Sequence, residues 1–292
     1  SVFRKYIDQW IGDNEVEFSR TAVYSFHAAA AERWSNGNIF LLGDAAHQMP
    51  PFMGQGMNSG CRDAENLLWK INGVIKGLYK PKILDTYETE RKPHVARITR
   101  AAIKLGGVIN AKSKFRALVR NATLRIQGYF KGKENIFPIM NGNRLGQGVH
   151  NMPKIKDVSL ERYYFNEISV RLNDGRVQST DKILGKNFGM ILNNFEGNKK
   201  ISDKYLEFLN KHNFKIINIS DNHEQSNYDN YIACEDTHSD MQIYCDKYDC
   251  NAVILRPDKY VFDIFNFETD NLDEIVSSVI KSLEETALFT LN

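Results

Sequence analysis

The residues best suited to chemistry lie between positions 43 and 58, in the sequence GDAAHQMPPFMGQGMN. Asp44 supplies a carboxylate that can accept hydrogen bonds from the hydroxyl groups of a sugar or polyol. Pro50 and Pro51 form a stiff extended segment without N–H donors. Gly54 and Gly56 permit positive φ angles and a close approach of the backbone to a ligand. This combination predicts a loop that contacts a polar ligand.

A helix is expected directly after this loop. Apolar residues recur there at helical spacing: Ala64, Leu67, Leu68, Ile71, Val74 and Ile75. Asn58 or Ser59 is expected to cap the start of the helix, and Gly77 to close its end. Free backbone N–H groups at residues 56–58, together with the helix dipole, would favour negative charge. The loop and the helix therefore predict a binding site for negative charge.

Upstream elements must position this loop. The apolar run at residues 38–42 ends in Gly43 and predicts a strand buried on both faces, as in a parallel sheet. Asp44 would then lie just past the carboxyl end of a strand, where ligands of open α/β sheets bind. Residues 22–30 predict a second strand or an extended edge, with Tyr24 and Phe26 on one face. Further along, Pro93 is expected to open a new helix.

The later part of the chain alternates strands and helices. Strands are predicted at residues 187–193, 214–219, 252–255 and 260–265, and helices at residues 201–211 and 272–288. The order β-α-β, an interval, and then β-β-α is that of a thioredoxin-like fold. The chain has four cysteines but no Cys-x-x-Cys pair, so we expect neither disulfide exchange nor a metal site.

Composition limits the classes of function. The chain has 292 residues, of which 42% are hydrophobic and 25% are charged, and its formal net charge of +2 argues against nucleic-acid binding driven by bulk charge. No apolar run reaches the roughly 18 residues of a membrane-spanning helix, and the few cysteines predict a reducing, cytoplasmic setting. The change in residue composition along the chain predicts three parts: residues 1–105, a basic and irregular connection at 106–155, and an α/β domain at 156–292.

Residues 43–58 resemble the second flavin-contacting motif of the class A FAD-dependent aromatic monooxygenases, most of all the 3-(3-hydroxyphenyl)propionate hydroxylase branch. Further similarity lies at residues 22–27 (AVYSFH), 31–34 (AERW), 62–70 (RDAENLLWK), 84–94 (LDTYETERKPH) and 255–258 (LRPD). The resemblance implies an α/β fold. A partial FAD-binding domain, similar to those of glutathione reductase and p-hydroxybenzoate hydroxylase, would precede a thioredoxin-like domain.

The resemblance also implies an activity: hydroxylation of a phenol, such as 3-(3-hydroxyphenyl)propionate or 3-hydroxycinnamate, in aromatic catabolism. FAD would be the cofactor, NADH or NADPH and O2 the co-substrates, and a flavin C4a-hydroperoxide the hydroxylating species. Pro50 and Pro51 would border the reacting ring without acting as acid or base, and Tyr24, Phe26 and Phe52 would line the substrate pocket. The cofactor contacts implied are Gly43, Asp44, Gly54, Gln55, Gly56, Met57 and Asn58. Asp44 would hold a hydroxyl of the ribityl chain.

Members of this family begin with a Gly-x-Gly-x-x-Gly unit that binds the ADP part of FAD, and this chain contains no such motif. We therefore expect the chain to be the C-terminal portion of a longer hydroxylase. The resemblance also implies that the protein forms a homodimer. Two alternatives stay open: a hydroxylase that tailors polyketides or antibiotics, and a non-catalytic fragment or dimerisation module. His47 and Trp34 are expected to have structural roles rather than chemical ones.

Overall fold

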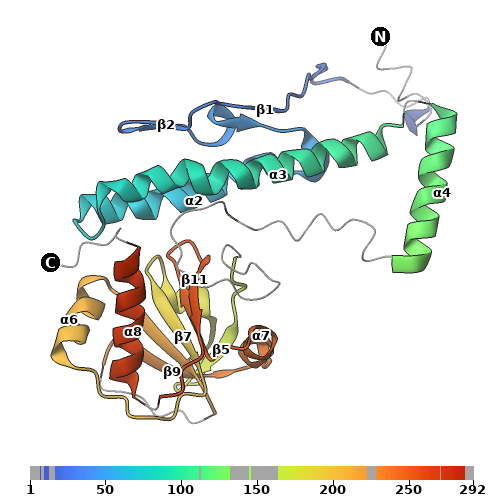
Figure 1. The fold of residues 1–292 in the computed structure, drawn as a ribbon. Coiled ribbons are helices and arrows are strands. Elements are labelled where there is room, and N and C mark those ends of the chain that lie inside the picture. The colour runs from blue at the N-terminus through green and yellow to red at the C-terminus, as the bar shows by residue number, and fades with distance from the viewer. Residues whose placement is uncertain are drawn as a thin grey trace.

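A computed structural model of the chain describes residues 7, 10–12, 17–111, 113–131, 145, 164–221, 228–269 and 271–286, and the statements below concern these residues. They form a long helical part with short strands and a C-terminal α/β part, shown in Figure 1. Within the described ranges, no helix is both long enough and apolar enough to cross a bilayer. The domain limits near residues 105 and 155 remain predictions.

The helix expected after the loop is α2 (Gln55–Ile75). It begins before the predicted caps Asn58 and Ser59, so that prediction is wrong. Gly54 adopts a left-handed φ of 62° and turns the chain directly into the helix, which only glycine does at little cost. Gly77 follows the other end with a φ of 70° and donates its N–H to the Val74 carbonyl, as predicted for a glycine that closes a helix.

A second long helix, α3 (Thr86–Ile109), runs alongside α2 and is joined to it through the short 3-10 helix η3 (Pro81–Asp85) (Figure 1). The prediction that Pro93 opens a helix is wrong, because Pro93 lies inside α3. An interior proline costs a helix about 3 kcal/mol. The side chains of Arg91 and His94, on either side of it, are fully buried in polar contacts, and this packing holds the helix together across the proline.

The N-terminal strands are much shorter than predicted. Within residues 22–30 only β1 (Ala29–Ala30) forms, paired antiparallel with β4 (His47–Gln48). Within residues 38–42 only β3 (Ile39–Phe40) forms, in a hairpin with β2 (Ser35–Asn36). Ile39 is 68% exposed, so the predicted buried strand of a parallel sheet is wrong. An apolar run becomes a buried strand only where neighbours cover it, and β3 has a single strand neighbour among the described residues.

The C-terminal part is built on one mixed sheet of seven strands in the order β11-β10-β7-β8-β9-β5-β6. Its strands are β5 (Ser169–Leu172), β6 (Val177–Ser179), β7 (Gly189–Asn193), β8 (Lys215–Ile219), β9 (Tyr231–Asp236), β10 (Ala252–Leu255) and β11 (Val261–Phe265). Its helices are α5 (Thr180–Leu184), α6 (Asp203–Lys211), α7 (Asp240–Tyr248) and α8 (Leu272–Glu285). The elements β7, α6, β8, β10, β11 and α8 follow the predicted thioredoxin-like order. Between β8 and β10 lie β9 and α7, which were not predicted from the sequence.

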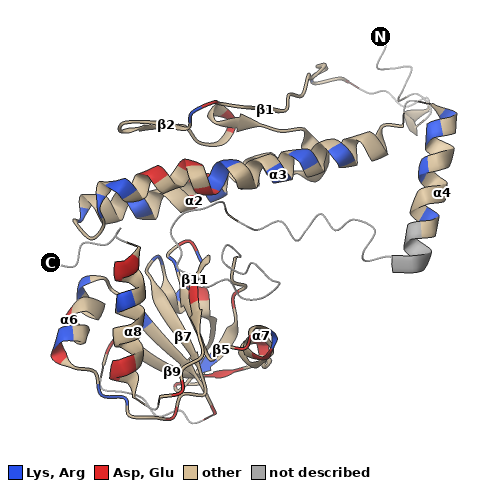
Figure 2. Cartoon of the chain, viewed as in Figure 1, with Lys and Arg blue, Asp and Glu red and all other residues tan. Residues whose placement is uncertain are grey.

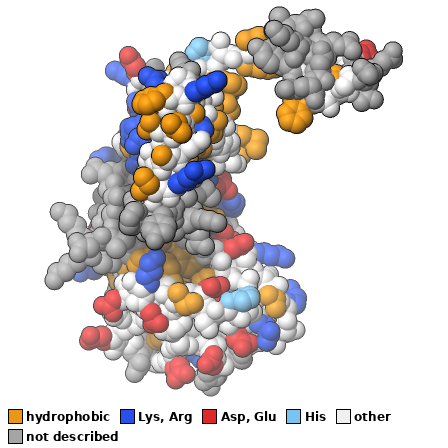
Figure 3. Space-filling model, turned by 90° about the vertical axis from the view of Figure 1, so that its right-hand side faces the viewer, with side chains coloured by type: hydrophobic (Ala, Val, Ile, Leu, Met, Phe, Trp, Pro, Cys, Tyr) orange, Lys and Arg blue, Asp and Glu red, His pale blue; other side chains and the backbone are white. Residues whose placement is uncertain are grey.

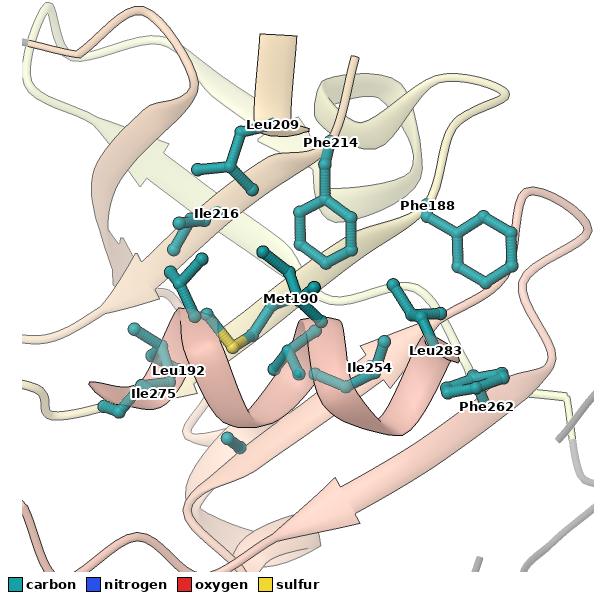
Figure 4. Packing of buried hydrophobic residues seen from close by; sticks show 14 of the residues in the cluster. Phe188, Met190, Leu192, Leu209, Phe214, Ile216, Ile254, Phe262, Ile275 and Leu283 are labelled. Atoms are coloured by element: carbon teal, nitrogen blue, oxygen red, sulfur yellow. The ribbon is translucent and has the colours of Figure 1, made fainter. Parts of the chain in front are cut away.

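Helices cover both faces of this sheet. Along β7, Met190 and Leu192 face the layer of α6 and α8, whereas Ile191 faces the layer of α5 and α7, as the period of two in a strand requires. Figure 4 shows the first layer, in which Phe188 and Phe262 lie beside Leu283, near the C-terminal end of α8. These side chains form a hydrophobic core of the C-terminal part. Their burial stabilises the fold by about 25 cal/mol per Å² of apolar surface removed from water.

The helical part is packed onto this core. Trp69 of α2 lies edge-to-face against Phe188 with ring centroids 5.5 Å apart, and Tyr79 packs edge-to-face against both of these rings, at 5.5 Å from Trp69 and 6.3 Å from Phe188. Gly73 makes room for Tyr79, since a Cβ there would lie 1.9 Å from the Tyr79 ring. The position of α2 is therefore set by both parts of the molecule.

Candidate functional site

The glycine-rich loop is fastened to α2 by a close backbone contact. Gly43 opens the 3-10 turn η1 (Gly43–Ala45) with a φ of 54°. A Cβ on Gly60 of α2 would lie 3.2 Å from the Gly43 Cα, so the turn packs directly on the helix. Asp44 lies in this turn with its side chain exposed, whereas Ala46 and His47 behind it are buried. The turn thus presents one carboxylate outward from a fixed backbone.

Asp63 of α2 organises the buried side of the loop. Its Oδ2 accepts hydrogen bonds from the Gly43 N–H at 3.1 Å and from His47 Nε2 at 2.7 Å. Its Oδ1 accepts one from Arg91 Nε of α3 at 2.8 Å, and Arg91 in turn contacts His94 Nδ1. One carboxylate therefore ties the turn, the following strand and both long helices together. The expected structural role of His47 is confirmed by its bond to Asp63.

Electrostatics keeps this carboxylate ionised. Burial alone would raise the pKa of Asp63, but the hydrogen bond from His47 and the charge of Arg91 outweigh burial and hold the pKa below its usual value. An ionised acceptor binds the Gly43 N–H more strongly than a neutral one would. The geometry of the turn is therefore coupled to the charge on Asp63.

The two prolines lead into the helix through a second short turn. Pro50 is extended, with φ −60° and ψ 148°, and precedes the 3-10 turn η2 (Pro51–Met53). The ring of Phe52 rests on Gly106 of α3, where an added Cβ would lie 2.3 Å from the ring. This contact holds the turn η2 against α3. Pro51 is exposed at the tip of the loop, and Pro50 is half-buried.

The start of α2 presents free donors. No described side chain caps its first turn, and that turn contains no acidic residue. Gly54, Met57 and Asn58 are exposed, and Gln55 and Gly56 are half-buried. The first N–H groups of a helix have no partner within the helix, and the helix dipole adds positive potential there. The arrangement can bind carbonyl oxygens or negative charge on a flat ligand edge.

The structure leaves part of the predicted substrate pocket open. Tyr24 and Phe26 are 63% and 61% exposed, on a segment that forms no strand. Phe52, the third predicted lining residue, is engaged with Gly106 rather than with either aromatic ring. The predicted cofactor residues lie in η1, at the end of η2 and in the first turn of α2, and η1 packs on α2 through Gly43 and Gly60. The assignment of these three side chains to a pocket remains a prediction.

Sequence reasoning missed the buried polar residues beneath the site. Asp63, Asn66 and Lys70 lie on one face of α2 and are fully buried. The spacing i, i+3, i+7 of three polar residues within an apolar helix pattern is the signal that could have found them. Their partners could not be found in the same way, because Arg91 lies on α3 and Arg256 lies far along the chain.

Two known families match the two parts. Residues 7–102 match the family described as FAD binding domain, and residues 164–281 match the HcaD C-terminal domain. These matches confirm the predicted resemblance to FAD-dependent aromatic hydroxylases, and the first agrees with the FAD-binding domain that the resemblance implies. The chain spans about half the length of the curated relatives it matches.

Curated relatives are named as hydroxylases. The chain is 28% identical over 266 residues to a 3-(3-hydroxy-phenyl)propionate/3-hydroxycinnamic acid hydroxylase of Burkholderia cenocepacia, covering 88% of this chain and 49% of the relative. The enzyme of the same name from Escherichia coli K12 is 27% identical over 256 residues, 85% of this chain and 46% of the relative. A probable NADH-specific resorcinol 4-hydroxylase of Rhodococcus jostii is 44% identical over 115 residues, 39% of this chain and 22% of the relative.

Solved structures share the fold. The flavin-dependent monooxygenase PieE, in complex with FAD and substrate, superposes with a TM-score of 0.66 at 21% identity, over 97% of this chain and 54% of its own. Aklavinone-11 hydroxylase, in a ternary complex with FAD and aklavinone, gives 0.61 at 19% identity, over 90% and 46% of the two chains.

Proposed function

We propose that this chain contributes the ring-facing part of an FAD site and takes part in hydroxylating a phenolic compound with O2 and NADH or NADPH. The observation that carries the proposal is the uncapped start of α2, which opens beside a turn held by Asp63. Electron transfer from the nicotinamide, activation of O2 and delivery of one oxygen atom to the phenol are chemistry that bound FAD supplies.

The residues present fit a flavin. Its pyrimidine edge carries carbonyl oxygens and becomes negatively charged on reduction, and the backbone N–H groups of Gly56 and Met57, in the first turn of α2, are donors of the required kind. A helix N-terminus stabilises such charge by about 0.3–2 kcal/mol. Glycine at position 56 lets a flat ring approach the backbone closely. The exposed carboxylate of Asp44 would accept a hydrogen bond from a ribityl hydroxyl group.

The remaining residues of the loop would orient the reactants and exclude water. Pro50 and Pro51 offer no N–H donors and a rigid apolar edge, which suits a border between the ring and a phenol. Met53, half-buried beside them, would help exclude water from the reacting atoms. Neither proline can move a proton, so the group that deprotonates the phenol lies elsewhere.

A small phenol is the proposed substrate, resembling 3-(3-hydroxyphenyl)propionate, 3-hydroxycinnamate or resorcinol. The names of the curated relatives support this class. A bulky polyketide substrate has weaker support, because the tailoring enzymes resemble this chain at 21% identity or less. A cytoplasmic setting and a homodimer belong to the same proposal.

The proposal is tested by titrating the purified chain with FAD and following the quenching of flavin fluorescence. We expect saturable binding that riboflavin competes for, because the proposed contacts go to the ring and the ribityl chain. Asp44→Asn should weaken binding about 3- to 30-fold, the range for loss of one charge-assisted hydrogen bond. Asp85→Asn, an exposed aspartate at the start of α3, is the matched control and should bind as the parent does.

Activity follows from binding in a second assay. The protein should oxidise NADH or NADPH faster when a phenol is present, with the hydroxylated phenol as product. Absence of flavin binding by a folded chain, or equal binding by Asp44→Asn and the parent, would contradict the proposed site.

A further inference from the structure

The helix α4 (Lys114–Lys131) stands at the far end of α3 and points away from the helix pair (Figure 1). Arg120 fastens one side of it, because its Nη1 donates to the carbonyl oxygens of Val108 at 3.0 Å and Ile109 at 3.3 Å at the end of α3. Ala117 and Leu124 lie half-buried on this same side. The opposite side of α4 therefore faces outward.

The outward side is apolar. It carries Phe115, Leu118, Val119, Ala122 and Ile126, at the spacing i, i+3, i+4, i+7 and i+11 of a single helix stripe. All five are exposed, Phe115 to 73% and Leu118 to 67%. The stripe extends for about 17 Å along the helix. An exposed row of large apolar side chains on one helix is costly in water and marks an interaction surface.

Positive charge surrounds this stripe. Lys114 and Arg125 lie along one edge and Arg116 along the other, as the helical period places them, and all three are exposed. Figure 3, which turns the side bearing α4 toward the viewer, shows hydrophobic side chains on that face with Lys and Arg at its margins. On the part of α4 that is not grey, Figure 2 shows Lys and Arg but no Asp or Glu.

The sequence concentrates its positive charge in this region. Residues 93–133 contain ten Lys and Arg and no Asp or Glu. The rest of the chain contains 28 Lys and Arg against 36 Asp and Glu, so its formal net charge is −8 despite the net +2 of the whole chain. A separation of charge this large favours an anionic partner for the basic segment.

We propose that α4 binds the surface of an anionic lipid bilayer, lying flat with its apolar stripe among the acyl chains and its flanking cations at the headgroups. Apolar burial and attraction to anionic lipid together drive such binding. Nucleic acid would use the charge but not the stripe, and an apolar protein groove would use the stripe but not the cations. This proposal does not depend on the proposed hydroxylase function.

The test is co-sedimentation of the purified full chain with vesicles of phosphatidylcholine, with and without phosphatidylglycerol. We expect binding only where phosphatidylglycerol is present, and weakening at high salt because exposed charges are screened. Each Lys or Arg at such a surface contributes about fivefold in affinity. In a Leu118→Trp variant, tryptophan fluorescence should shift to shorter wavelength on binding.

A matched pair of variants locates the surface. Ile126→Glu should weaken vesicle binding at least about tenfold, because it places a carboxylate in the stripe. Ile243→Glu makes the same change on α7 of the C-terminal part, at 60% exposure against 58% for Ile126, and should bind as the parent does. The proposal is overturned if the parent does not sediment with anionic vesicles or if Ile126→Glu sediments equally well. It is also overturned if gel filtration shows a dimer that Ile126→Glu dissociates while vesicles do not bind.

Discussion

Two buried charge clusters lie on the same pair of helices and serve different ends. In the first, Asp63 of α2 joins His47, Arg91 and the backbone of Gly43. In the second, Glu90 of α3 joins Lys70 of α2 and Arg256 of the β10–β11 turn. The first cluster fixes a loop that faces outward, and the second fixes one part of the molecule to the other.

The second cluster is the more fully satisfied of the two. Glu90 binds Arg256 through both carboxylate oxygens, at 2.8 and 2.9 Å, and Lys70 Nζ at 2.8 Å. Asp258 holds the same guanidinium at 2.9 and 2.7 Å, and Asn66 bridges Glu90 and Asp258. Two cations meet two carboxylates out of water. A ring of charge this complete rigidifies a junction, whereas the smaller Asp63 cluster leaves one side of its loop open for a ligand.

Replacement of Glu90 is expected to have the largest effect on stability. Burial alone would raise the pKa of Glu90, but the charges of Arg256 and Lys70 hold the pKa far below its usual value. Glu90→Gln removes the carboxylate that pairs with buried Lys70 and leaves Arg256 paired with Asp258 but not with Glu90, and we expect it to lower the free energy of unfolding by about 3–5 kcal/mol. Urea denaturation measures this. Glu235→Gln, which breaks the exposed pair with Arg171, is the control and should cost at most about 1 kcal/mol.

Asp63→Asn tests the other cluster. It removes the charge that pairs with Arg91 and weakens the acceptor for the Gly43 N–H, so we expect a loss of about 2–3 kcal/mol in unfolding free energy. Asp63→Asn should also lower the affinity for FAD. Glu90→Gln, measured at a temperature where that variant is folded, should leave the affinity for FAD unchanged. Denaturation and the fluorescence titration, run on both variants, check this contrast. Equal effects of the two variants on FAD affinity would remove the distinction between the clusters.

Two adjacent glycines of α3, Gly106 and Gly107, test the contact between Phe52 and this helix. Gly106→Ala would place a Cβ 2.3 Å from the Phe52 ring and displace η2, at a cost of about 1–3 kcal/mol. Gly107→Ala meets nothing within 4 Å and should stabilise the helix by up to about 1 kcal/mol. Thermal unfolding of the two variants checks the difference in sign. Similar behaviour would mean that Phe52 does not rest on α3.

Asp263 is a buried carboxylate with no cation among its described partners, and its effect on stability has the opposite pH dependence to that of Asp63 and Glu90. Asp263 of β11 accepts hydrogen bonds from Ser282 Oγ at 2.6 Å and the Ile264 N–H at 2.9 Å, and burial raises its pKa to about 6. The unfolded chain loses this proton near pH 4, so the folded state loses stability as pH rises from about 4 to about 6. Asp263→Asn should therefore gain about 1–2 kcal/mol at pH 7 and flatten that slope. Denaturation at pH 5 and pH 7 measures both quantities.

Local sequence pattern predicted the elements that carry their own signal. The core strands β7, β8, β10 and β11 are apolar runs between turn residues, and α2 has apolar residues at helical spacing, so their burial follows from composition. The loop of the flavin motif follows from Gly43, Gly54 and the two prolines, because few residue types adopt those conformations.

Features that depend on distant partners could not be predicted. The run at residues 38–42 is apolar enough for a buried strand, but a strand's burial is decided by its neighbours. The helix α2 begins earlier than predicted because Gly54 turns the chain directly into the helix, so that no side-chain cap is needed. The two charge clusters were missed because Asp63 and Glu90 resemble ordinary helix surface residues until Arg91 and Arg256 are placed beside them.

Hydrogen exchange of the full chain, measured by mass spectrometry with and without FAD, tests the central claim most directly. The account predicts slower exchange on adding FAD in the segment from η1 to the first turn of α2, residues 43–58, and unchanged exchange in the sheet strands β7 to β11. Protection confined to the C-terminal sheet, or no protection at saturating FAD, would contradict the claim that this loop and helix start hold the flavin.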